Sequence, residues 1–314
     1  MNKKKIGLLV FITMLAIGML IGCSSTNKEN SADEKNEKTR VIKHELGETK
    51  VKENPKRVVV LELGFIDALL DAGIKPVGVA DDDKAEQLID KDVLKEIKGY
   101  KSVGTRAQPS LESIKLLKPD LIIADSERHK NVYKELSKIA PTIELKNLNA
   151  NYDDLLNTEL KVGEAVGKKA KVEKVIEEHK QKMKDLKAKA PKNPGNVLVI
   201  ADANGNINAR TSNFFTTGVL EQLGFKNALT DPTKEYSVKM TMEQLVKADP
   251  DKLIVMRNEK GHTPLAKQPL WKELKAVKNN QVYEVDVFKW SLRRSVQGAN
   301  GIADEAEKLL FEGK

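Results

Sequence analysis

Arginines recur just after segments predicted to be β-strands, in a chain that otherwise carries its surface charge mostly on lysine. Arg106 follows Ser102-Val103, Arg128 follows Leu121–Asp125, Arg210 follows Ile207–Ala209, Arg257 follows Leu253–Met256, and the Arg293-Arg294 pair follows Val282–Val285. A guanidinium group is planar and meets a carboxylate through two parallel, charge-assisted hydrogen bonds. Ligands of open α/β sheets bind outside the carboxyl ends of the strands. The pattern therefore predicts a site for a multiply charged anion, with a surface ion pair as the alternative for each arginine taken singly.

Two further features bear on this predicted site. Trp290 is predicted to line the cleft, with core packing as the alternative interpretation. Arg293 and Arg294 are adjacent, so in regular structure their side chains face different ways. We therefore expect at least one of the two to point elsewhere, and the sequence does not say which.

Direct metal binding and enzymatic activity are not expected. His129 and His262 are the two histidines expected near the cleft, whereas a metal site needs three or four converging His, Asp or Glu ligands. The chain has no G-x-S-x-G, G-x-G-x-x-G or H-E-x-x-H motif. The segment 163–169 lacks both the spacing and the Ser/Thr of a phosphate-binding loop. The sequence therefore predicts a binding protein without a cofactor.

Alternating apolar runs and helical segments must position these arginines. Arg57–Leu61 is a continuous apolar run typical of a strand buried on both faces of a parallel sheet. A helix follows over residues 65–72, and the alternation restarts at Asn196–Ile200. Pro109–Ile123 resembles Thr241–Val255, about 130 residues further on, which is too long a period for a solenoid. Each segment contains a capped helix, a Pro-Asp turn and a buried strand, so we infer two homologous lobes.

A long helix separates the two lobes in the sequence. Lys168–Lys189 has apolar residues at helical spacing and would span about 33 Å, the width of a small domain. A coiled-coil partner helix is a weak alternative, because the apolar repeat is short and irregular. We predict an N-terminal lobe over 40–166, a linking helix over 167–191 and a C-terminal lobe over 192–314. The predicted fold class is α/β, with two lobes, central parallel-type sheets and a ligand cleft between the lobes.

The N-terminal residues have the pattern of a secretory leader. Lys3–Lys5 precede the apolar run Ile6–Ile21, which is short for a membrane span, and Gly22-Cys23 follows. The motif closely resembles the bacterial lipobox, which implies cleavage after residue 22 and lipidation of Cys23. An uncleaved membrane helix is the alternative. Residues 23–39 have almost nothing to bury and are predicted to form a flexible tether.

The net charge of +8 does not indicate nucleic-acid binding. Lysines are interleaved with glutamates and aspartates, a pattern typical of a solvated, ion-paired surface. Aromatic residues make up only 4% of the chain, which disfavours an aromatic-lined groove for single strands.

The chain resembles the ferric-siderophore and vitamin-B12 class of periplasmic-binding-protein-like folds. The resemblance covers residues 40 to the C-terminus, and its markers are the two repeated segments above and Pro269–Asp286. Within that class, residues 104–106 and 290–295 look most like ferric-citrate and carboxylate-siderophore binders. The resemblance implies two Rossmann-like lobes joined by one long helix, and a lipid-anchored, monomeric substrate-binding protein on the outer face of the cell membrane. It also implies an ABC permease dimer and its ATPase as partners.

The resemblance also implies roles for individual residues. Ligand contacts are implied for Arg106, Arg128 and the Arg293-Arg294 pair, whereas Arg210 and Arg257 rest on their strand-end positions alone. Glu112 and Glu243 occupy matching positions in the two repeats, where the family has a glutamate that forms salt bridges to the permease. A favourable carboxylate at a helix start is the alternative for both. The implied function is capture of ferric citrate, with another siderophore (catecholate or hydroxamate), haem or a corrinoid as the alternative ligand. An extracytoplasmic enzyme or an adhesion lipoprotein is a remoter alternative.

Overall fold

The structure is a computed structural model that describes residues 38–203, 205–229, 235–257 and 263–311. Glu37–Lys314 forms one compact unit, and it contains two sheet-bearing lobes. The predicted leader, Cys23 and most of the predicted tether lie outside the described residues, as does His262. Among the described helices, none is long and apolar enough to cross a membrane.

The first lobe is built on a parallel sheet. Its strands are β3 (Val58–Val60), β4 (Gly78–Val79), β5 (Lys101–Ser102), β6 (Leu121–Asp125) and β7 (Thr142–Leu145). They pair in the order β5-β4-β3-β6-β7, with every neighbouring pair parallel. β3, β6 and β7 are buried along their whole length, as the continuous apolar run predicts for β3.

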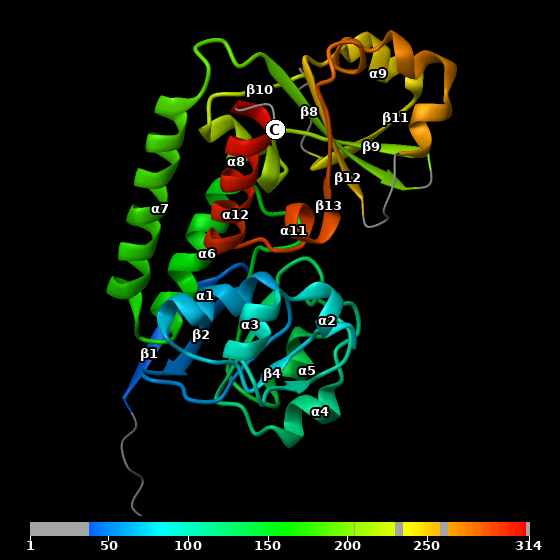
Figure 1. Cartoon of the computed structure of the whole chain (residues 1–314). Coiled ribbons are helices and arrows are strands. Elements are labelled where there is room, and N and C mark those ends of the chain that lie inside the picture. Colours follow the sequence, from blue (N-terminus) through cyan, green and yellow to red (C-terminus); the bar gives the residue numbers. More distant parts are fainter. Residues whose placement is uncertain (1–37, 204, 230–234, 258–262, 312–314) are drawn as a thin grey trace, which may run out of the picture. The chain divides into compact units, whose positions relative to one another are not determined.

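Short helices and a hairpin surround this sheet (Figure 1). The helices are α1 (Gly64–Ala72), α2 (Ala85–Leu88), α3 (Lys91–Glu96), α4 (Leu111–Leu116) and α5 (Tyr133–Ser137), and the hairpin strands are β1 (Thr39–His44) and β2 (Gly47–Lys52). Gly73 ends α1 in a left-handed conformation, with φ of 81°, which glycine adopts without steric cost.

The second lobe is built on a mixed sheet. Its strands are β8 (Asn196–Ala203), β9 (Asn206–Arg210), β10 (Lys226–Asn227), β11 (Ser237–Met240), β12 (Lys252–Arg257) and β13 (Val282–Asp286). The order is β11-β9-β8-β12-β13, with β10 also paired to β8. The helical segments of this part of the chain are α8 (Phe215–Gln222), α9 (Met242–Ala248), η1 (Pro264–Lys267), η2 (Pro269–Glu273), α10 (Lys275–Lys278) and α11 (Val287–Ser291).

One strand departs from the predicted parallel arrangement. β9 pairs antiparallel to both β8 and β11, while β8, β12 and β13 are parallel to one another. The short connection between β8 and β9 allows only a hairpin, because a parallel crossover needs a dozen or more residues. Gly205 in this connection has φ of +85°, as a tight hairpin turn requires.

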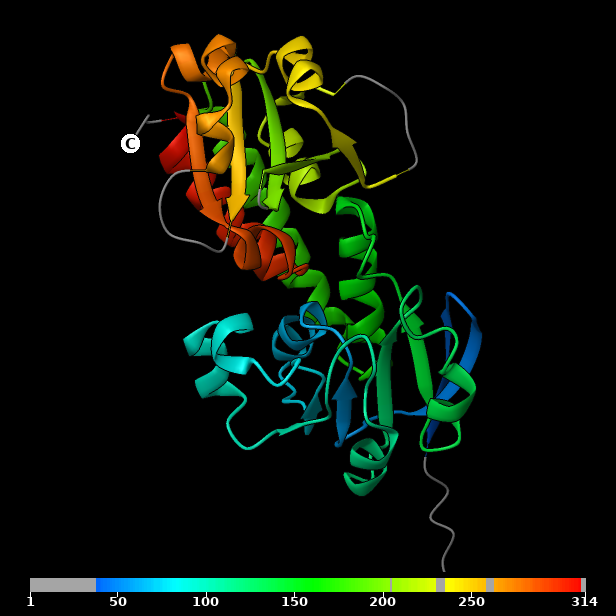
Figure 2. The ribbon, with the colours of Figure 1, turned by 90° about the vertical axis from the view of Figure 1, so that its right-hand side faces the viewer.

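Helices link the two lobes. They are α6 (Tyr152–Ala165), α7 (Lys169–Lys189) and α12 (Val296–Ala306), which η3 (Glu307–Phe311) extends. α7 runs from the first lobe to the second in both ribbon views (Figures 1 and 2). One hydrophobic cluster contains Phe65 of α1, Val162 of α6, Ile176 of α7, Phe214 before α8 and Ile302 of α12. The predicted two-lobed α/β fold is therefore confirmed, whereas the exact lobe boundaries remain predictions.

The carboxyl ends of the main strands face the space between the lobes. In Figure 2 the arrowheads of β12 and β13 point toward the first lobe, and the arrowhead of β3 points toward the second. Residues that follow these strands are thus brought to the same region, which is where a ligand of an α/β sheet is expected.

Candidate functional site

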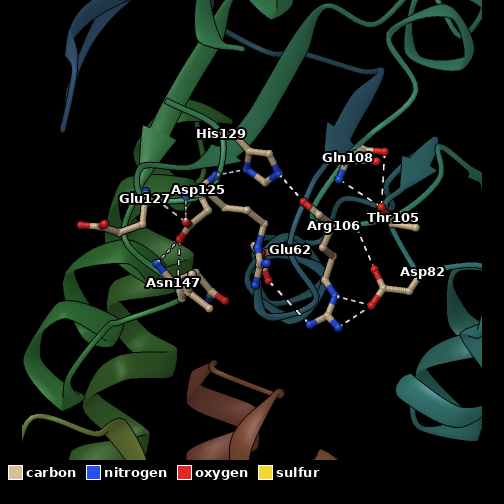
Figure 3. A network of polar contacts seen from close by, with 11 residues as sticks. Glu62, Asp82, Thr105, Arg106, Gln108, Asp125, Glu127, His129 and Asn147 are labelled. Atoms are coloured by element: carbon tan, nitrogen blue, oxygen red, sulfur yellow. Dashed lines mark hydrogen bonds and ion pairs between the residues drawn. The ribbon is translucent and has the colours of Figure 1, made fainter. Parts of the chain in front are cut away.

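The centre of the candidate site is the carboxylate of Glu62, in the turn between β3 and α1. The side chain is completely buried. Arg128 Nε donates a hydrogen bond to Oε1 over 2.5 Å, and Arg106 Nη1 lies 3.9 Å from Oε2. Figure 3 shows Glu62 with the Arg106 guanidinium on one side. Glu62 Oε2 accepts no hydrogen bond from any described residue. Two of the predicted arginines therefore converge on one buried acid.

Asp82 holds the Arg106 side chain in place. Its Oδ2 accepts hydrogen bonds from Nε over 3.0 Å and from Nη2 over 2.5 Å, and its Oδ1 accepts one from the Arg106 backbone N–H (Figure 3). Burial works to raise the pKa of Asp82, but the hydrogen bonds from Arg106 outweigh burial and leave that pKa below its ordinary value. Asp82 and Asp83 both have positive φ, 57° and 53°. The loop after β4 therefore adopts a strained conformation that directs the Asp82 carboxylate toward Arg106.

Asp125 fixes the turn that carries Arg128. Its Oδ1 accepts the backbone N–H groups of Glu127 and Arg128, and its Oδ2 accepts those of Asn147 and Leu148. Asp125 ends β6 and is completely buried. Four backbone donors satisfy this carboxylate, so it serves the loop geometry and leaves the arginine side chains free for other partners.

His129 connects the two arginine-bearing loops. Its Nδ1 accepts the N–H of Asp125 over 2.9 Å, so Nε2 carries the ring proton and donates to the carbonyl oxygen of Arg106 over 2.8 Å (Figure 3). Burial lowers the pKa of His129 and keeps the ring neutral. Because both ring nitrogens are engaged, His129 positions Arg106 and has no nitrogen left for a metal. Within the described ranges, no group of three or more His, Cys, Asp or Glu side chains is arranged to hold a metal ion.

Arg294 approaches the same site from the second lobe. It lies between α11 and α12, is 6% exposed, and its charge interacts with those of Glu62, Arg106, Asp125 and Arg128. Its Nε and Nη1 are buried and have no hydrogen-bond partner among the described residues. Burial lowers the pKa of Arg294 to about 10, against the opposing attraction of Glu62. A buried guanidinium with unmatched donors is costly unless an anion satisfies it.

Arg293 points to different partners. Its Nε and Nη2 donate to the two carboxylate oxygens of Asp67 on α1, over 2.7 and 3.0 Å, and its Nη1 pairs with Asp90 before α3. Ser295 Oγ donates to the same Asp67. The structure therefore directs the two adjacent arginines differently, Arg294 toward the Glu62 cluster and Arg293 into an ion pair that ties the second lobe to the first.

A groove of about 210 Å³ lies beside this ion pair. Residues of α1 and of the segment 86–93 line it from the first lobe, and Asp286, Phe288 and Lys289 line it from the second. Arg293 and Asp67 are part of its wall. Arg293 is thus the predicted arginine that lines this open space, and the residues of the Glu62 cluster are not part of its wall.

The other two predicted arginines lie in the second lobe, away from Glu62. Arg257 ends β12 and is 9% exposed, with Nη1 3.3 Å from Glu284 Oε2 and Nε 4.0 Å from Asp202 Oδ2. Arg210 ends β9, and its guanidinium lies over the ring of Phe214, 4.6 Å from the ring centre. Arg210 was predicted to lie at the carboxyl end of the sheet because it follows a strand. This prediction was wrong, because β9 runs antiparallel to β8 and ends opposite the middle of β8. A ligand role for either residue remains a prediction.

Trp290 does not line the groove. It is completely buried in α11, its Nε1 donates to Glu305, and its carbonyl oxygen accepts from Thr216. The prediction that Trp290 forms a cleft wall is therefore corrected: the indole belongs to the helical core that joins the lobes. Core packing was the alternative interpretation of this residue.

The two predicted docking glutamates occupy equivalent places. Glu112 lies in the first turn of α4, after the capping Ser110, and Glu243 lies in the first turn of α9, after the capping Thr241. Both glutamates are exposed. The caps confirm the local likeness of the two repeats, and the permease contact remains a prediction.

Comparison with known proteins identifies the family of the chain. Residues 58–287 match the family model described as "Periplasmic binding protein", and the chain belongs to that family. It is 51% identical over 98% of both chains to YhfQ of Bacillus subtilis (strain 168), which is named provisionally as an ABC transporter substrate-binding lipoprotein. It is 41% identical, again over 98% of both chains, to the Fe(3+)-citrate-binding protein YfmC of the same organism. The crystal structure of Staphylococcus aureus SirA complexed with staphyloferrin B is similar, with a TM-score of 0.74, 26% identity, and coverage of 86% of this chain and 98% of that one.

Sequence reasoning missed the acids of the site. Glu62, Asp67 and Asp82 each hold at least one of the predicted arginines, yet the strand-end pattern singles out only cations. A usable signal existed for Glu62, because an acid directly after a fully apolar strand run is costly to bury without a partner. The pairing of Asp67 with Arg293 had no such local signal.

Proposed function

We propose that this protein captures ferric citrate as the substrate-binding component of an ABC importer. The coarser role, binding of a ferric siderophore complex for such an importer, agrees with the family and with the names of the relatives. The finer assignment to citrate rests on the chemistry of the site and on the likeness to a citrate-binding relative.

The observation that carries the proposal is the unpaired guanidinium of Arg294. It is buried, lacks partners for two nitrogens, and belongs to the same charge cluster as Arg106 and Arg128. The acids Glu62, Asp82 and Asp125 balance the three guanidinium charges, but they leave two buried nitrogens of Arg294 without an acceptor among the described residues. A compact ligand that carries several carboxylates would supply acceptors for these donors.

The energetics are consistent with useful affinity. A hydrogen bond to a charged group contributes about 1.5–3 kcal/mol. Three or four such bonds would supply a large part of the ~8–12 kcal/mol that micromolar to nanomolar binding requires, before the ordering costs are subtracted. Arg106 and Arg128 are already held by Asp82 and Glu62, so little side-chain entropy remains to be lost.

The role in transport adds further proposals. Glu112 and Glu243 dock onto the permease dimer, one from each lobe, because two equivalent acids suit a two-fold symmetric partner. Cys23 carries the lipid that anchors the protein at the outer face of the cell membrane. The protein acts as a monomer, and the iron reaches it already coordinated by the ligand, so that no residue of the chain is a direct iron ligand.

Calorimetric titration of the purified protein tests the ligand. The panel contains ferric citrate, iron-free citrate, a ferric hydroxamate and a ferric catecholate. We expect ferric citrate to bind most tightly, and Arg106→Met and Arg128→Met each to weaken it about 10- to 150-fold. Arg57→Met is the matched control. Arg57 precedes β3, at the amino end of the strand and away from the site, and its side chain donates to the backbone carbonyl of Leu117. Equal affinity of the two site variants and the parent for ferric citrate, or tighter binding of a neutral hydroxamate complex, would overturn the assignment.

A further inference from the structure

Glu62 is a feature of the site that anion-binding arginines alone do not explain. An acid at the centre of such a cluster repels the proposed ligand. It is nevertheless completely buried, and it contacts Arg128 directly over 2.5 Å. Its position must therefore serve the empty site, the loaded site, or the exchange between them.

The charged groups that face Glu62 come from several elements. Asp125 ends β6, and Arg128 lies in the turn after it. Arg106 lies in the loop after β5, and Arg294 lies before α12. Asp125 is already satisfied by four backbone N–H groups, so it is no partner for the arginines. Among these neighbours, only Glu62 offers Arg128 a carboxylate, while Arg106 also has Asp82.

We propose that Glu62 is an internal counter-anion that keeps Arg128 and Arg106 in position while the site is empty, and that it takes up a proton from solvent when an anionic ligand binds these arginines. This inference rests on the proposed function and deepens it, because it makes ferric citrate capture proton-linked. Glu62 is a positioning residue in the empty state, and it lowers the repulsion toward the ligand by becoming neutral in the loaded state.

The geometry explains why the proton is needed. When ligand carboxylates take over the donors of Arg128, Glu62 Oε1 loses its hydrogen bond, and Oε2 has none to begin with. An ionised carboxylate would then be left in a dry pocket next to the negative charge of the ligand. Both burial and a nearby like charge favour the neutral carboxyl. Protonation also gives the group an O–H donor, which a ligand oxygen can accept.

The pKa of Glu62 points in the same direction. Burial raises it above the ordinary value for glutamate, and the neighbouring Asp125 adds to that effect, while Arg128, Arg106 and Arg294 oppose it. A bound anion that competes for these arginines removes the opposing contribution, so the pKa rises further. Ligand affinity must then increase as the pH falls, since the loaded site binds the proton more tightly than the empty one.

Proton uptake is measured by titrating ferric citrate into the protein in two buffers of different ionisation enthalpy. We expect the parent to take up a fraction of a proton, approaching one, per ligand, and Glu62→Gln to take up none. The ratio of the parent's dissociation constant to that of Glu62→Gln cancels the titration of the ligand itself. We expect this ratio to rise with pH by up to about tenfold per pH unit between the two pKa values of Glu62.

Asp82→Asn is the matched control. It removes an equal charge from the same cluster, but the Asp82 side chain is 25% exposed and its partner Arg106 keeps a second carboxylate nearby. Asparagine also tolerates the positive φ at this position. We expect Asp82→Asn to retain the proton uptake, whatever its affinity. Thermal melting of both variants checks that they are folded.

The outcomes separate the two proposals. If the parent does not bind ferric citrate, the proposed function fails. If the parent binds ferric citrate with no buffer-dependent enthalpy, or if Glu62→Gln shows the same proton uptake as the parent, the inference about Glu62 fails and the proposed function stands. Should Glu62→Gln be unfolded, Glu62→Asp provides the second test: the shorter carboxylate keeps the proton linkage, and its absence in that variant also refutes the inference.

Discussion

Replacement of Arg294 by methionine should stabilise the empty protein and weaken its binding of ferric citrate. Methionine keeps most of the apolar stem and removes the guanidinium. That group is 6% exposed, and two of its nitrogens have no hydrogen-bond partner among the described residues, so its removal takes away a buried charge that Glu62 and Asp125 offset only in part. In the loaded protein the same group is proposed to bind a carboxylate, so its removal takes away a charge-assisted bond.

The magnitudes follow from the burial. A pKa of about 10 for Arg294 corresponds to a cost of about 3 kcal/mol for carrying the charge in the folded protein. Arg294→Met removes this cost, but methionine fills the space of the arginine imperfectly and part of the stabilisation is lost. We therefore expect the free energy of unfolding to rise by about 1–3 kcal/mol. Loss of a charged hydrogen bond should raise the dissociation constant for ferric citrate by about 10- to 150-fold.

Urea unfolding of the ligand-free protein and calorimetric titration of the folded protein measure the two effects. Arg293→Met is the control, because it changes the adjacent residue in the same way. Arg293 is paired with Asp67, whose side chain is 4% exposed, so its loss leaves a buried carboxylate and should cost about 2–4 kcal/mol of stability. If Arg294→Met lowers the stability of the empty protein as Arg293→Met does, the reasoning about an unpaired charge is refuted.

Three further predictions concern other parts of the molecule. A Cβ at Gly64 would lie 2.1 Å from the carbonyl oxygen of Arg294. Gly64→Ala should therefore lower the free energy of unfolding, measured in urea, by about 1–3 kcal/mol, and should weaken ligand binding. Unchanged stability would show that the backbone around Arg294 can move to accommodate the methyl group. Glu112→Lys and Glu243→Lys should reduce iron uptake by cells while leaving the affinity of the purified protein for ferric citrate unchanged, and normal uptake by both variants would exclude them from docking. Burial keeps the pKa of His179 below 6.5, so the unfolded chain binds more protons than the folded one. The free energy of unfolding should therefore fall as the pH drops below about 6.5, by at most about 1.4 kcal/mol per pH unit. His179→Gln should show a flatter dependence of stability on pH, and an identical dependence would contradict the role of His179.

Local signals predicted most of the fold. The apolar runs at β3 and β6 are typical of strands buried on both faces, and the structure places them at the centre of a parallel sheet. The long helical run became α7 within one residue of the predicted start. The antiparallel β9 was missed, although the Asn-Gly dipeptide at 204–205 is a strong hairpin signal. The prediction extended to β9 the parallel arrangement expected for the neighbouring strands.

The site was less predictable than the fold. Arg106 and Arg128 lie in the turns that follow β5 and β6, as predicted, whereas Arg294 follows helix α11, and a ligand role for all three remains a prediction. Which charges are paired depends on contacts between residues far apart in the sequence, such as Arg293 with Asp67, and no local pattern encodes these. The left-handed Asp82 likewise binds Arg106, which lies 24 residues further along the chain. A single sequence contains the donors, but not their partners.

The hydrophobic cluster that runs through α1, α6, α7 and α12 makes the halves of this protein interdependent. A fragment cut at the end of α7 would expose the apolar faces of helices from both halves, so neither piece should fold by itself in water. Partial truncation should therefore yield aggregated material instead of an independently folding half, and thermal or chemical denaturation should proceed as one cooperative event.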